Sequence, residues 1–193
     1  LTIKKFASVG GESTRYPITN NEVQACFFNI QSSQSSFCVD HLYAVNGKKG
    51  FYKLDVSDDA FGASPLPTLE GGGSIACALD QSNQMVYYNV GKDLYRYDIQ
   101  TKTFEKYAVG NPFNGNYPRM ELKDDTLYIS NGTTLYTVDI KTNEVLNTYQ
   151  IEGFINNSSG GDIAFGTDGV LYLACFSGLY KFTSFSDDKA YII

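Results

Sequence analysis

Four polar residues, Glu22, Ser74, Arg119 and Asp162, each stand directly before a short apolar segment, and these segments recur along the chain. Carboxylates can transfer protons or bind divalent cations, and an arginine binds carboxylates in a bidentate manner. If the four segments lie side by side, these residues line one rim of the molecule. We therefore interpret them as candidate ligand-binding positions, the alternative being loop positions under no common constraint.

The loop before Arg119 is the best single candidate for recognition. It places Asn116 and Tyr117 next to Pro118 and the arginine, and polar and aromatic groups together suit a carboxylate or a sugar. The competing interpretation is a turn in which proline and asparagine set the backbone angles.

Several other chemistries are disfavoured by the residue types. His41 is the single histidine, so a histidine cluster is excluded, and no G-x-S-x-G elbow is present. The glycine runs at 71–73 and 160–161 lack the G-K-[ST] end of a phosphate loop. Three acidic pairs predict solvated turns, with Ca²⁺ as the alternative; no other cofactor is indicated. The pairs are Asp58-Asp59, Asp124-Asp125 and Asp187-Asp188.

A repeated segment sets the architecture. Leu94-Tyr95-Arg96-Tyr97-Asp98 has near-copies at 51–55, 135–139 and 179–183, and the shared tyrosine recurs at spacings of 43, 41 and 44 residues. The segments between are four to eight residues long and alternate with a period of two, as in strands. A repeat of about 40–45 residues built of short strands is typical of β-propeller blades.

The repeat predicts an all-β chain of four four-stranded antiparallel blades, forming a small propeller or part of a larger one. Residues 1–10 are similar to 103–110, so we expect them to supply the outer strand of a closing or preceding blade. The predicted blades span 22–70, 71–111, 114–153 and 157–193.

The aspartate that ends the repeated segment has a structural explanation. Asp55, Asp98 and Asp139 are expected to accept backbone N–H groups in the following turn, a role that Thr183 in the fourth copy also tolerates. The tyrosines are expected to pack between blades.

Composition narrows the partners. The 193 residues carry 15 basic and 21 acidic side chains, a net charge of −6, which disfavours nucleic acids and anionic lipid. No apolar run is long enough for membrane insertion. Cys26 and Cys38 flank a polar run, which indicates either a disulfide across a hairpin or two buried thiols. Asn131, Asn156 and Asn157 match the N-glycosylation pattern, which is compatible with secretion.

Residues 161–173, followed by Gly178-Leu179-Tyr180-Lys181-Phe182, resemble a blade of the SMP-30/NHL/YVTN-like propeller group. Residues 135–143 are similar to the L-Y-x-Φ-D-x-x-T-G signature of quinoprotein-type propellers, with Asn143 in place of the usual glycine. The resemblance implies a propeller over residues 22–193. In lactonase members it implies acidic and asparagine metal ligands at the channel entries, where Ser74 and Arg119 stand here.

These features predict a non-catalytic binding or structural module of a secreted, cell-surface or virion-appendage protein, located outside the cell or on its surface. Its expected partner is a glycan, a protein surface or the rest of a larger parent chain or assembly. The alternative is an enzyme of lactonase or lyase type that uses Asp162, Glu22 and a divalent metal at the channel mouth.

Overall fold

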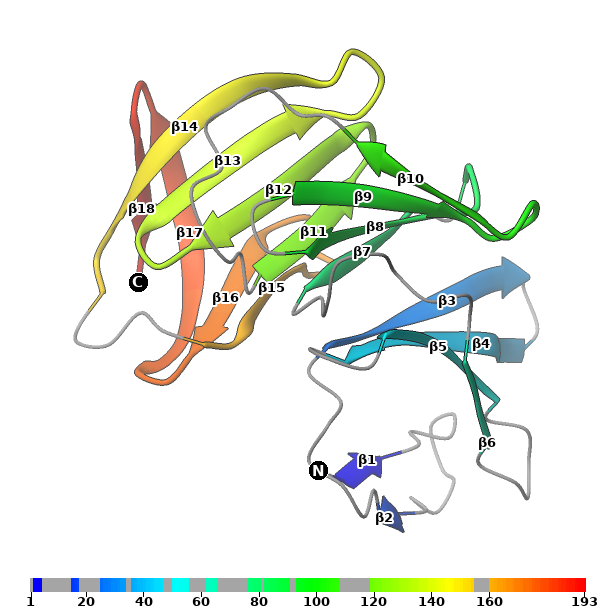
Figure 1. The fold of residues 1–193 in the computed structure, drawn as a ribbon. Coiled ribbons are helices and arrows are strands. Elements are labelled where there is room, and N and C mark those ends of the chain that lie inside the picture. Colours follow the sequence, from blue (N-terminus) through cyan, green and yellow to red (C-terminus); the bar gives the residue numbers. More distant parts are fainter. Residues whose placement is uncertain are drawn as a thin grey trace. The chain divides into compact units, whose positions relative to one another are not determined.

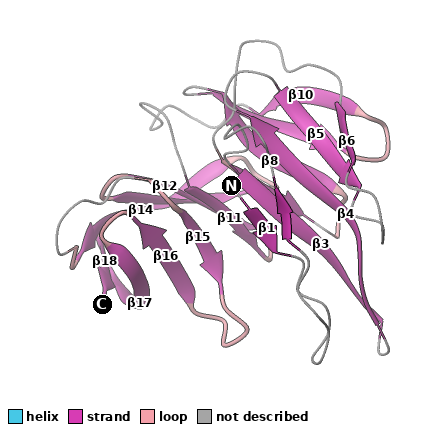
Figure 2. Cartoon of the chain, turned by 90° about the horizontal axis from the view of Figure 1, so that it is seen from below, coloured by secondary structure: helices cyan, strands magenta, loops and turns pink. Residues whose placement is uncertain are grey.

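The computed structural model describes the backbone of eleven stretches of the chain, and every structural statement below refers to them. They are residues 2–4, 15–17, 25–33, 36–46, 50–55, 62–65, 76–80, 82–90, 93–107, 119–154 and 160–193. All regular structure in these stretches is β-strand (Figure 2). Among the described residues there is no apolar helix of the length that a bilayer requires. The chain divides into two compact units, Leu1–Gly73 and Ser74–Ile193.

The first unit contains one four-stranded antiparallel meander, blade 1, in the order β3-β4-β5-β6. Its strands are β3 (Ala25–Ser33), β4 (Ser36–Asn46), β5 (Gly50–Asp55) and β6 (Gly62–Pro65). The short strand β1 (Thr2–Lys4) pairs with β2 (Arg15–Pro17) in a separate sheet. The first residues thus do not form the outer strand of a four-stranded sheet, as their similarity to 103–110 had predicted.

The hairpin of β3 and β4 sets the relation between the two cysteines considered for a disulfide. In its register Cys26 lies opposite Ala44, whereas Cys38 lies opposite Gln31. Strands advance about 3.3 Å per residue, so five positions separate the cysteines by far more than the roughly 7 Å that a disulfide spans between Cα atoms. This register does not favour the predicted disulfide, and the side chains lie outside the described set.

The second unit contains three more meanders. Blade 2 consists of β7 (Cys77–Asp80), β8 (Met85–Val90), β9 (Asp93–Asp98) and β10 (Thr103–Tyr107). Blade 3 consists of β11 (Arg119–Lys123), β12 (Thr126–Asn131), β13 (Thr134–Asp139) and β14 (Glu144–Glu152). Blade 4 consists of β15 (Asp162–Phe165), β16 (Leu171–Cys175), β17 (Gly178–Ser186) and β18 (Lys189–Ile192). The all-β, four-bladed organisation expected from the repeat is confirmed.

Blades 3 and 4 are joined at their outer strands. Residues 150–152 of β14 pair in parallel with 189–191 of β18, so the two meanders form one eight-stranded sheet (Figure 1). All other strand pairs in these blades are antiparallel. The parallel contact thus links two repeats side by side at the rim.

The first strands of blades 2, 3 and 4 lie next to one another, with β11 in contact with both β7 and β15 (Figure 1). We call the face of a blade that packs on the following blade its front face, and the opposite face its back face. The front face of blade 2 contributes Ala78 and Leu94 to a core shared with Met120 and Ile129 on the back of blade 3. Period-two alternation of the strands therefore supplies both faces of each blade.

The same arrangement recurs one blade further on. Leu135, on the front of blade 3, packs with residues from the back of blade 4 in a second core. These are Ile163, Leu171, Leu173, Tyr180 and Phe182. Both cores combine the same repeat positions, and this explains why the leucine and tyrosine of the repeated segment recur: one serves the front face and the other the back face.

The turn-capping role predicted for two of the aspartates is confirmed. Asp98 Oδ1 accepts hydrogen bonds from the amides of Gln100 and Thr101, at 2.8 and 2.9 Å. Asp139 Oδ1 accepts from Lys141 and Thr142, at 2.7 and 3.1 Å. These bonds lower the pKa of both carboxyl groups. The capping geometry of Asp55 lies outside the described residues.

Thr183 does not take the same role. No turn follows it, because β17 continues to Ser186, and the Thr183 hydroxyl donates to the carbonyl of Tyr191 on the neighbouring strand at 3.2 Å. The interpretation of this threonine as a turn cap is therefore wrong. Without the carboxylate that captures two amides, the backbone remains in the sheet for three more residues.

Candidate functional site

Two of the predicted rim residues meet in the structure. Arg119 is the first residue of β11 and Asp162 the first residue of β15, and these two strands contact each other. The sequence alignment of the repeats thus placed both correctly at the starts of adjacent inner strands. The other members of the predicted site lie outside the described residues and stay predictions. They are Glu22, Ser74, Asn116 and Tyr117.

Arg119 is fully buried, with 0% of its surface exposed. Its Nε donates to the carbonyl of Gly160 at 3.0 Å, and one terminal nitrogen donates to the Ser130 hydroxyl at 3.1 Å and the Gly132 carbonyl at 3.0 Å. Burial lowers the pKa of the guanidinium, and the charge of Asp162 partly offsets this shift. The arginine thus connects the hairpin of blade 3 to the segment that enters blade 4.

Asp162 connects the same two strands from the other side. Its Oδ1 accepts from the amide of Ile163 at 2.8 Å and, across the blade boundary, from the amide of Met120 at 3.4 Å. Part of the side chain is exposed at the front of blade 4, but desolvation of the carboxyl raises its pKa to about 6. The backbone hydrogen bonds and Arg119 oppose this increase.

A third ionisable residue, Glu121, completes the cluster and was missed in the sequence. Desolvation raises its pKa to about 7, and the negative charge of Asp162 raises it further against the opposing effect of a hydrogen bond from the Leu122 amide. The signal that could have revealed it is the alternation of Arg119, Glu121 and Lys123 within an otherwise apolar strand, which places all three on one face.

The cluster therefore consists of one buried guanidinium and two carboxyl groups whose pKa values lie near neutrality. Such groups can exchange protons at physiological pH, and they can also serve only to hold two blades together. Among the described residues no group of three or more His, Cys, Asp or Glu side chains is placed to hold a metal ion. In the acidic pair of the β11–β12 turn, Asp125 forms an exposed ion pair with Lys141 at 2.5 Å.

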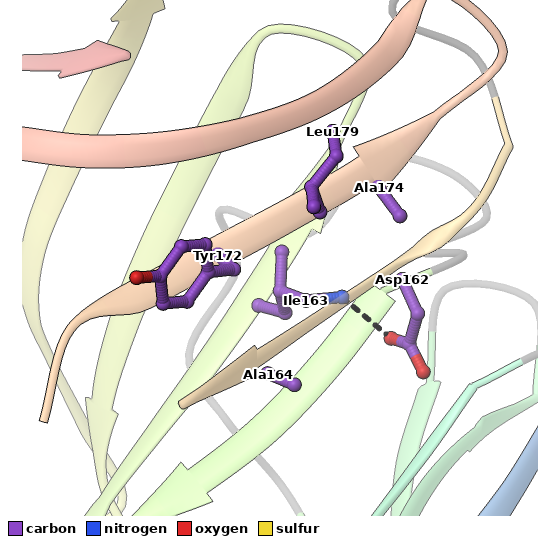
Figure 3. A pocket seen from close by; sticks show the side chains of 6 residues that line it. All are labelled: Asp162, Ile163, Ala164, Tyr172, Ala174 and Leu179. Carbon is purple, nitrogen blue, oxygen red and sulfur yellow. Dashed lines mark hydrogen bonds between the residues drawn. The ribbon is translucent and has the colours of Figure 1, made fainter. Parts of the chain in front are cut away.

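A second feature is a shallow apolar hollow of about 150 Å³ on the front face of blade 4. Asp162, Ile163 and Ala164 of β15 line it together with residues of β16 and β17, as Figure 3 shows. The residues from those strands are Tyr172, Ala174 and Leu179. All except Ile163 and the half-buried Tyr172 belong to the exposed class.

The exposure of this face departs from the rest of the repeat. Leu179 is 72% exposed, whereas the residues at the same repeat position, Leu94 and Leu135, are 5% and 0% exposed. The neighbouring Phe176, in the β16–β17 turn, is 80% exposed. Sequence reasoning did not single out this face, because an equivalent leucine in every copy predicts equivalent burial.

Of the three candidate glycosylation sites, Asn131 ends β12 and is partly exposed, whereas 156 and 157 lie outside the described residues. Modification at each of them stays a prediction.

No family model and no curated protein matches the chain. Among solved structures, one of U3-55K matches with a TM-score of 0.48 at 11% identity, covering 77% of this chain and 50% of that one. A structure of the RRP9 WD40 repeats matches with a TM-score of 0.48 at 11% identity, covering 76% and 48%. The chain thus spans about half the length of these two structures.

The propeller component of the predicted resemblance is confirmed, whereas these matches give no support to the SMP-30/NHL group in particular. The expectation of an extracellular or cell-surface location is contradicted by the identity of the matched proteins, which points to the cell interior. We therefore withdraw that location.

Proposed function

We propose that this chain is a non-catalytic β-propeller module that binds a protein partner through the front face of blade 4. The observation that carries the proposal is the exposure of Leu179, at 72%, in a repeat position that is buried in blades 2 and 3. A blade face with the residue types of an interior but open to water is suited to a macromolecular contact.

Energetic reasoning supports a partner at this face. Burying a leucine side chain contributes about 1.5–3 kcal/mol, and Phe176 adds a second large apolar group nearby. Ala164 and Ala174 are small and flank the hollow, so that a partner can approach the sheet closely. An interface with an apolar centre and charged residues around it has the composition of a protein contact.

A glycan partner, which the loop before Arg119 suggested, has no support from the described residues, since Asn116 and Tyr117 lie outside them. The SMP-30/NHL/YVTN-like group stays the sequence resemblance of the individual blades. We base the binding proposal on the blade face alone.

A photocrosslinking experiment tests the proposal. A benzophenone amino acid is placed at position 179 or, as a matched control, at Leu146, a half-exposed leucine of β14. We expect a discrete crosslinked species in cells only from position 179, and its mass identifies the partner. Absence of a crosslink at 179, or equal crosslinking from both positions, would contradict the proposal.

A second candidate, an acid–base enzyme at the blade 3–blade 4 boundary, is favoured by one observation. Glu121 and Asp162 have pKa values raised to about 7 and about 6 on neighbouring strands, which suits a proton donor and acceptor near neutral pH. Turnover of lactones or polysaccharides, assayed with and without divalent cations and lost in E121Q, would establish it. No turnover by the folded wild-type chain would exclude these substrates.

A further inference from the structure

We propose that the partner of the blade 4 front face is a second copy of this chain, packed front face to front face about a two-fold axis. This inference rests on the proposed function and names the occupant of the same surface. It starts from the arrangement of the exposed side chains on the three strands that form the face.

The strand register places these side chains in two rows. In the first row Asp162, Ala174 and Leu179 lie side by side across β15, β16 and β17. In the second row Ala164, Tyr172 and Lys181 do the same. Because cross-strand partners share a face, all six point away from the core of blade 4. The central strand therefore presents an aromatic and a small residue, and the flanking strands present charges.

The charges on the flanking strands are of opposite sign. β15 carries Asp162, and β17 carries Lys181, both exposed. A two-fold axis that runs along β16 places β15 of one copy over β17 of the other. Each Asp162 then lies near the Lys181 of the facing copy, which gives two equivalent attractive pairs, as an isologous interface requires. The charge pattern thus favours the chain's own face as its complement.

The shape of the face agrees with this arrangement. The same axis places the exposed Leu179 of one copy over Asp162 and Ala164 of the other, two of the residues that line the hollow. A protruding leucine next to a hollow with small walls is complementary to its own symmetry mate. Front-face burial in blades 2 and 3, where Leu94 and Leu135 are covered, shows that this repeat position tolerates close packing against another sheet.

Sedimentation velocity of the purified 193-residue chain over a concentration series tests the proposal. We expect the wild type to sediment as a species of twice the 21.3 kDa of one chain. L179D is expected to raise the dissociation constant of the dimer by about tenfold or more, because it replaces a buried leucine with a charge. L146D, the matched control on β14, is expected to leave the dimer unchanged.

A second variant tests the charge pairs. K181E places two negative charges near each other across the axis and is expected to weaken the dimer, with the larger loss at low salt. Circular dichroism and thermal unfolding of each variant confirm that the fold is retained, since Leu179 and Lys181 are exposed and contribute little to the core.

A wild-type chain that is monomeric at all concentrations overturns the inference, as does a dimer that L179D leaves intact or that L146D disrupts equally. If the purified chain is monomeric but position 179 crosslinks to a different protein in cells, the second copy is excluded and the proposed function is retained. If neither assay gives a contact at position 179, both fail together.

Discussion

Blades 3 and 4 have the same frame but differ at four equivalent positions. Arg119 in blade 3 corresponds to Asp162 in blade 4, Glu121 to Ala164, Leu135 to Leu179, and Asp139 to Thr183. The first member of each pair lies at the boundary between the two blades or in a closed turn. The second lies on a face open to solvent or in a strand that continues.

The comparison shows how one repeat serves two purposes. In blade 3 the front-face residues are used within the molecule, because Arg119 and Leu135 are fully buried against blade 4. In blade 4 the corresponding surface has small and apolar residues but nothing of this unit covers it, as the exposure of Leu179 shows. Repetition therefore accounts for the sheet, and the identity of the neighbour accounts for the role of each side chain.

The largest effect in this comparison is expected from R119M. The substitution removes the donors for the Gly160 and Gly132 carbonyls inside the protein, so we expect a loss of about 4 kcal/mol in the free energy of unfolding. Urea unfolding followed by circular dichroism measures it. The control R96M removes an arginine whose ion pair with Glu105 is largely exposed, and a loss of only about 0.5 kcal/mol is expected. Equal losses would show that Arg119 has no special role at the blade boundary.

The leucine pair tests the comparison most directly. L135A opens a cavity in the core between blades 3 and 4 and is expected to cost about 3 kcal/mol. L179A changes a side chain that is 72% exposed, and within the monomer it is expected to alter stability by less than about 0.5 kcal/mol. Chemical denaturation at a concentration where the chain is monomeric measures both. Similar costs at the two positions would mean that the front face of blade 4 is covered.

The third prediction concerns pH. The pKa of Glu121 is raised to about 7 from an ordinary value of 4.5, so the folded state binds more protons than the unfolded state between these values. Stability therefore falls as pH rises from about 4.5 to 7. E121Q retains an acceptor for the Leu122 amide but cannot ionise, and it is expected to be more stable than wild type at pH 8 by about 1 kcal/mol.

Denaturation midpoints measured from pH 4 to pH 8 give this difference. The gap between E121Q and wild type should widen toward pH 7 and then stay constant. Asp162 adds a separate slope at lower pH, since its pKa is raised to about 6, and this slope is expected in both proteins. Parallel curves over the whole range would rule out the raised pKa of Glu121.

The smallest effect is expected at the fourth pair. D139A removes the carboxylate that accepts two turn amides, so the turn between β13 and β14 loses its cap and stability decreases by less than in L135A. T183A removes one hydroxyl donor on an exposed strand and is expected to have a smaller effect still. Thermal unfolding of both variants measures this order, and a larger loss for T183A would reverse the interpretation.

The period of the tyrosines was sufficient to predict the blades, because a recurring strand pattern can be buried only by stacking equivalent sheets. It also placed Arg119 and Asp162 at the starts of adjacent strands. The partners of Arg119 were beyond its reach, since the carbonyls of Gly132 and Gly160 lie 13 and 41 residues away and carry no side-chain signal.

Two further features depend on tertiary context in the same way. Glu121 is unremarkable in sequence, and its pKa is raised only because β15 packs beside it. Thr183 was expected to behave as its aspartate counterparts do, but a hydroxyl captures no pair of amides and the strand continues. Side-chain chemistry at a repeat position thus decides where a strand ends, whereas the neighbouring blade decides what a face does.

The parallel pairing of β14 with β18 has a consequence for aggregation. An outer blade strand normally presents a row of free backbone donors and acceptors, which is a template for adding strands from other molecules. Here residues 150–152 and 189–191 engage each other's edges, so each outer strand protects part of the other. Two potential nucleation edges for amyloid-like growth are thereby partly covered by a contact of only three residue pairs.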